Sequence, residues 1–142
     1  MICCFVLRYV APEYALTGML TEKSDVYSFG VLMLVVVSGR RPLQVMDSPL
    51  VEFERANLVS WSRHLAHFGN VLDLVDTSLK GAFDEPQATL CITIALLCLQ
   101  RLPSMRPSMN EVLKMLLGEM QCPSLPSQLS LSHRCRRTRK PR

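Results

Sequence analysis

The sequence has few aromatic residues, no apolar run long enough for a membrane span, and no regularly spaced cysteines. Aromatic residues make up 6% of the chain, a content that suits packed helices better than an all-β sandwich. The apolar stretch at residues 26–38 is shorter than the roughly 20 residues that a membrane-spanning helix needs. We therefore interpret it as a helix that is buried on all sides in a globular core. The six cysteines include no C-x-x-C pair, which argues against a zinc site or a disulfide framework and favours free thiols.

Acidic residues are absent from the last ten positions, which carry six of the 16 Lys and Arg residues. Without those six, the rest of the chain has 10 basic and 12 acidic residues, so the formal net charge of +4 belongs to the C-terminal end alone. Residues 121–142 are rich in Ser and Pro and then basic, a composition that predicts a disordered tail. Because clustered Lys and Arg attract phosphates, nucleic-acid binding by this tail stays open as an alternative function.

Start and stop signals for a helix flank the long apolar stretch. Ser24 can cap the helix, and Asp25 lies in its first turn, where the positive end of the helix dipole favours a carboxylate. Ser38 and Gly39 end it, because Gly is the usual residue just past a helix end. The sequence therefore predicts one central helix of about four turns.

Periodicity and capping residues predict three further helices. Apolar residues recur at offsets of three, seven and ten from Leu58, as on one face of an amphipathic helix. Asp84 begins a second, largely enclosed helix. Ser108 and Glu111 form a capping box before a third, whose regularly spaced apolar residues are Met109, Val112, Leu113, Leu116, Leu117 and Met120. Residues 71–79 fit either a short helix or a turn. The predicted fold class is mainly α, with no convincing strand.

Three short motifs point to a protein family. They are Ala11-Pro12-Glu13, the run D-V-Y-S-F-G at residues 25–30, and Arg106-Pro107 before the last predicted helix. An A-P-E triplet alone is unspecific, but the three together, in this order, resemble the second half of a protein kinase domain. Residues 9–14, 20–32, 98–100 and 106–109 resemble plant receptor-like serine/threonine kinases in particular. We assign residues 9–120 to a partial kinase domain, the helical C-terminal lobe, and leave residues 1–8 unmatched.

The resemblance implies a role for several residues. Glu13 would pair with Arg106, joining the end of the activation segment, which also includes Tyr9, Ala11 and Pro12, to the last helices. Asp25 would accept hydrogen bonds from the backbone of the catalytic loop. Two simpler interpretations stay open: Glu13 and Arg106 as separate solvated charges, and Asp25 as an ordinary acid in the first turn of a helix.

The sequence lacks the motifs with which kinases bind nucleotide and transfer phosphate. It contains no G-x-G-x-x-G, no V-A-I-K, no His-Arg-Asp and no Asp-Phe-Gly, all of which phosphoryl transfer in this family uses. The resemblance therefore implies that an intact parent phosphorylates protein Ser and Thr with ATP and Mg²⁺, at the cytoplasmic side of the plasma membrane. We expect the chain itself to hold no cofactor and to be inactive, as the product of a truncated gene model, a late start codon or a pseudogene. The alternative is a non-catalytic helical module that binds partner proteins.

Overall fold

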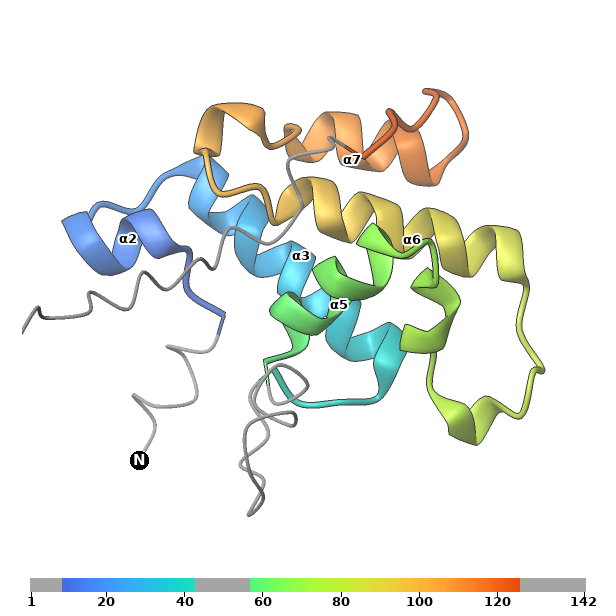
Figure 1. The fold of residues 1–142 in the computed structure, drawn as a ribbon. Coiled ribbons are helices and arrows are strands. Elements are labelled where there is room, and N and C mark those ends of the chain that lie inside the picture. Colours follow the sequence, from blue (N-terminus) through green and yellow to red (C-terminus); the bar gives the residue numbers. More distant parts are fainter. Residues whose placement is uncertain (1–8, 43–56, 126–142) are drawn as a thin grey trace, which may run out of the picture.

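Helices make up all the regular elements in the computed structural model, which describes residues 9–42 and 57–125 (Figure 1). The unmatched residues 1–8, residues 43–56 and most of the predicted tail lie outside the described residues. The α-helices are α2 (Pro12–Thr17), α3 (Glu22–Ser38), α5 (Leu58–His67), α6 (Glu85–Cys98) and α7 (Met109–Leu116). The short 3₁₀ helices are η1 (Val71–Leu74), η2 (Thr77–Leu79) and η3 (Pro103–Met105). The predicted fold class is confirmed, and residues 71–79 form two 3₁₀ helices.

The central helix α3 begins earlier than predicted, because Thr21 caps it. The Thr21 hydroxyl accepts a hydrogen bond from the Ser24 amide, and the Ser24 side chain accepts one from the Thr21 amide, so the two residues form a capping box. The prediction of Ser24 as the cap was wrong: both residues have a suitable hydroxyl, and only Thr21 has the extended backbone that a cap requires. The predicted end is confirmed, since Gly39 has a left-handed backbone and its amide bonds to the Val35 carbonyl.

Helices α3 and α6 cross closely at Gly30. A Cβ atom at Gly30 would lie 2.8 Å from Cys98 Cβ and 2.9 Å from the Ala95 carbonyl oxygen. Only a residue without a side chain lets the two backbones approach this far. In Figure 1, α6 lies between α3 and α7, and α5 packs against α3. Helix α6 therefore contacts the central helix on one side and the last helix on the other.

Two apolar clusters fill the spaces between these helices. The larger one joins α3, α5 and α6 through residues that include Leu34, Trp61 and Leu96. The smaller one joins α3, α6 and α7 through residues that include Val26 and Met115. As predicted, no side chain of α6 from residue 88 onward is exposed. None of the helices in the described ranges is both long and apolar enough to cross a membrane.

One prediction about burial was wrong. Helix α3 is not buried on all sides, because Leu32 and Val36 are 48% and 73% exposed. Apolar composition shows that a side chain favours burial, but not that the chain supplies a neighbour to bury it. In α7, Val112 and Met115 are buried. Four of the regularly spaced apolar residues are exposed: Met109, Leu113 and Leu116 in the helix, and Leu117 directly after it. The apolar stripe of α7 is wider than the face that α6 covers.

Candidate functional site

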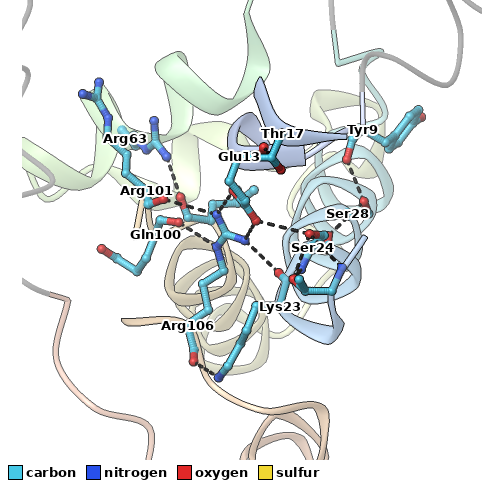
Figure 2. A network of polar contacts seen from close by, with 12 residues as sticks. Tyr9, Glu13, Thr17, Lys23, Ser24, Ser28, Arg63, Gln100, Arg101 and Arg106 are labelled. Carbon is cyan, nitrogen blue, oxygen red and sulfur yellow. Dashed lines mark hydrogen bonds and ion pairs between the residues drawn. The ribbon is translucent and has the colours of Figure 1, made fainter. Parts of the chain in front are cut away.

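The guanidinium group of Arg106 is the centre of the polar contacts shown in Figure 2. Arg106 is the largest fully buried side chain in the described part of the protein, with only 2% of its surface exposed. An arginine side chain has five N–H groups, and each of them makes one hydrogen bond. The acceptors, with donor–acceptor distances, are Glu13 Oε1 (2.6 Å), Glu13 Oε2 (2.8 Å), and the carbonyl oxygens of Gln100 (2.7 Å), Lys23 (2.8 Å) and Arg101 (3.3 Å). The buried charge is therefore fully satisfied.

Among the described residues, Glu13 supplies the only carboxylate that Arg106 contacts, and the two residues lie 93 positions apart in the sequence. Both carboxylate oxygens accept from the guanidinium, which is the bidentate geometry that makes arginine pairs strong. Ser24 donates a further, longer hydrogen bond of 3.4 Å to Oε1. The Arg106 hydrogen bonds hold the pKa of the Glu13 carboxyl below its ordinary value of 4.5. The Glu13 side chain is 23% exposed, so the pair lies at the edge of the protein with the arginine inside.

Local structure explains how Glu13 reaches this position. Pro12 occupies the first turn of α2, where its missing amide hydrogen costs nothing. Glu13 follows in the same turn, near the positive end of the helix. Ala11 is fully buried before it, and the carbonyl of Tyr9 accepts a 2.7 Å hydrogen bond from the Ser28 hydroxyl of α3. The segment from Tyr9 to Glu13 is therefore attached to the central helix at both ends.

The C-terminal end of α6 is held by two guanidinium groups. The last carbonyl groups of a helix have no partner within the helix. Here the Leu99 carbonyl accepts a 2.6 Å bond from Arg63 of α5, and the next two carbonyl groups accept from Arg106. Burial lowers the pKa of Arg63, and a helix C-terminus compensates for that burial because it carries partial negative charge. Arg63 therefore fastens α5 to the end of α6.

An aromatic ring covers one face of the Arg106 guanidinium. The guanidinium carbon lies 4.9 Å from the centre of the Tyr27 ring of α3, within the range of a cation–π contact. Burial raises the pKa of Tyr27, so its hydroxyl stays neutral at physiological pH. The ring keeps water from the arginine and adds no charge.

Asp25 lies apart from these contacts. It is in the first turn of α3, it is exposed, and within the described residues its carboxylate has no hydrogen-bonding partner. The structure thus brings Glu13 together with Arg106 and places Ala11, Pro12 and Tyr9 beside them, but leaves Asp25 at the surface.

Sequence reasoning missed the residues that hold the surroundings of the ion pair in place. Ser24 was considered only as a helix cap and Ser28 only as part of the D-V-Y-S-F-G run, because a hydroxyl group does not reveal its partner. Arg63 gave no signal at all, because its acceptor is a backbone carbonyl that any residue supplies.

The arrangement as a whole connects α2, the first turn of α3, the end of α6 and the loop before α7. These contacts hold the helices in place. Nowhere in the described ranges do three or more His, Cys, Asp or Glu side chains lie together as possible metal ligands.

Comparisons with known proteins give a consistent result. The family model for protein tyrosine and serine/threonine kinases matches residues 3–116, a range that begins within the residues left unmatched above. Two receptor-like serine/threonine-protein kinases of Arabidopsis thaliana are 59% and 56% identical to the chain, over 87% and 94% of its length. The chain spans only 18% and 20% of these two relatives.

A solved structure shares the fold. It is the pseudokinase domain of BIR2, described as an immune regulator of the RLK/Pelle family, with a TM-score of 0.66 and 28% sequence identity. The similarity covers 78% of this chain and 32% of the BIR2 chain. The described helices therefore correspond to part of a kinase-like domain.

Proposed function

The chain belongs to the protein tyrosine and serine/threonine kinase family, and we propose that it forms the helical C-terminal lobe of a receptor-like serine/threonine kinase. The intact parent would transfer phosphate from ATP to Ser and Thr of protein substrates. Its relatives are receptor-like kinases, so the parent would act at the cytoplasmic side of the plasma membrane. The chain by itself would provide the helical base of the lobe and would not catalyse the reaction.

The ion pair between Glu13 and Arg106 is the observation that carries this proposal. It connects the A-P-E segment, through a fully buried arginine, to the loop before the last helix. A buried charge is retained only where it is paired and hydrogen-bonded. Because all five donors of Arg106 are used, the A-P-E segment has one fixed position on the helices. A fixed position of this segment is what a surface that aligns a protein substrate requires.

The inactivity of the isolated chain follows from what phosphoryl transfer needs. The reaction depends on residues that position ATP, hold Mg²⁺ and orient the attacking hydroxyl. The sequence contains none of the motifs that supply them. Asp25 is an exposed carboxylate, and the described residues contain no group of three or more His, Cys, Asp or Glu side chains that could hold a metal ion. The described residues therefore do not fit ATP or Mg²⁺, which in the parent would bind to other segments.

A second candidate function is a non-catalytic module that binds partner proteins. It is favoured by the end of α2 and the loop that follows it, where Leu16, Met19 and Leu20 are largely exposed, Leu16 by 87%. Exposed apolar residues that lie together mark interaction surfaces or a risk of aggregation. The similarity to a pseudokinase domain also favours this candidate.

Two measurements test the proposal. Sequencing the full transcript should reveal an in-frame strand lysine and a His-Arg-Asp motif upstream, and their absence would end the case for a catalytic parent. The purified chain should show no change in melting temperature with Mg²⁺ and ATP, and no transfer of labelled phosphate to casein. A clear shift with Mg²⁺ and ATP would contradict the inactivity of the chain. If the transcript lacks the motifs and the chain is a monodisperse protein with a cooperative melt, the non-catalytic module is the better function.

A further inference from the structure

Lys23 and Arg106 are joined by two hydrogen bonds that run in opposite directions, although the residues lie 83 positions apart (Figure 2). Arg106 donates an Nη1 hydrogen to the carbonyl of Lys23, and Lys23 donates from Nζ to the carbonyl of Arg106. Each residue therefore uses its cationic side chain to hold the backbone of the other. Two bonds between the same two residues close a ring, which restrains their relative orientation as well as their distance.

We propose that Lys23 is a positioning residue of the ion-pair site: its ammonium group holds the backbone of Arg106 so that the guanidinium meets the Glu13 carboxylate. Arg106 follows η3, a helix of only three residues, and its own backbone is extended. Its amide makes one hydrogen bond, of 3.2 Å, to the Pro103 carbonyl. Such a short 3₁₀ turn does little to fix the residue after it. The carbonyl side of Arg106 therefore depends on Lys23.

The charges around the site support a geometric role for Lys23 rather than a direct role in charge pairing. The Glu13 carboxylate contacts the Arg106 guanidinium directly and acts on Tyr27 from farther away. Arg63 and Arg101 add positive charge nearby. Another cation beside Arg106 is repelled by it. Lys23 is tolerated because its Nζ bonds a carbonyl oxygen and because it attracts Glu111 at the start of α7. The bond that Lys23 makes at this site is to the backbone, not to the acid.

A double-mutant cycle on the full chain tests this role. Urea unfolding would be measured for the wild type, Lys23→Met, Glu13→Gln and the double variant. Methionine keeps a long unbranched stem and removes the donor. In the wild type, we expect Glu13→Gln to lower the folding equilibrium constant by about 100-fold, since it breaks a largely buried pair. In the Lys23→Met background, Glu13→Gln should lower the folding equilibrium constant by at most about 20-fold, because a misplaced guanidinium already holds Glu13 less well.

Two further variants separate positioning from a general loss of stability. Lys23→Arg keeps a cationic donor for the carbonyl and should restore the wild-type effect of Glu13→Gln. Lys114→Met removes an exposed lysine of α7 and should leave that effect unchanged. If Lys23→Met does not fold, the same cycle would be measured in trimethylamine N-oxide, which favours the compact state.

The proposal is overturned if Glu13→Gln has the same effect, within about twofold, in the wild type and in Lys23→Met, because independent sites behave additively. It is also overturned if Lys23→Met stays unfolded in the osmolyte while Glu13→Gln folds, since Lys23 then acts independently of the pair. None of these measurements involves ATP or a substrate. The role of Lys23 can therefore fail while the proposed kinase function stands, and the reverse also holds.

Discussion

Replacing Arg106 by lysine should destabilise the chain severely although it preserves the charge. Arg106 uses five donors in a planar fork, two on Glu13 and three on carbonyl oxygens. A lysine offers three donors from a single nitrogen, so at least two of these acceptors lose their partner. The lost hydrogen bonds involve a charged group, each worth about 1.5–3 kcal/mol. We therefore expect Arg106→Lys to lower the free energy of unfolding by about 3–5 kcal/mol.

That loss is large against the stability of a typical domain, which is about 5–15 kcal/mol. For a domain of this size it corresponds to a melting temperature lower by more than about 12 °C. Urea unfolding followed by far-ultraviolet circular dichroism measures the change directly. The matched control is Arg101→Lys, because Arg101 is exposed and offers only its backbone carbonyl to the site; it should stay within about 0.5 kcal/mol of the wild type. An Arg106→Lys variant as stable as this control would refute the importance of the five-donor geometry.

Two further predictions concern pH and helix packing. Because the pKa of Glu13 is below its ordinary value of 4.5 in the folded chain, its contribution to stability is complete above that pH and is lost as the pH falls through the folded-state pKa. Urea midpoints measured from neutral to acidic pH should therefore converge for the wild type and Glu13→Gln at low pH, and a constant difference would contradict this assignment. Gly30→Ala should lower the free energy of unfolding by about 1–3 kcal/mol, because its Cβ would meet α6 at 2.8 Å. Urea unfolding measures this change, with the exposed Val36→Ala as the control. If the two variants are equally stable, α3 and α6 can move apart without loss of stability.

The sequence predicted the helices well because their signals are local. The box of Ser108 and Glu111, the cap at Asp84 and the stop at Gly39 each act within a few residues, and the structure has all three. The choice between Thr21 and Ser24 as a cap failed, since it depends on backbone angles that two neighbouring hydroxyl residues do not reveal. The prediction that α3 is buried on all sides failed for a different reason. Apolar periodicity identifies a stripe, but the neighbouring helices decide how much of it is covered.

The centre of the site was predictable only in part. The family resemblance named Glu13 and Arg106 as partners, and no physical property of the sequence would have linked residues so far apart. The other three acceptors of Arg106 are backbone carbonyl groups, which leave no trace in the residue types of Lys23, Gln100 and Arg101. Bonds from a side chain to a distant backbone become visible only when the helices are in place.

The distribution of these contacts explains why one buried arginine can hold a small helical unit together. Helices α3 and α6 share an extensive apolar contact, whereas α2 has no buried residue of its own. Apolar packing alone would therefore not fix α2. Its position depends on Glu13, on the buried Ala11 before it, and on the bond between Ser28 and the Tyr9 carbonyl. Because a bidentate ion pair is directional and apolar contact is not, Arg106 gives α2 an orientation as well as an attachment. Loss of the pair should release the A-P-E segment first, while the α3–α6 core persists.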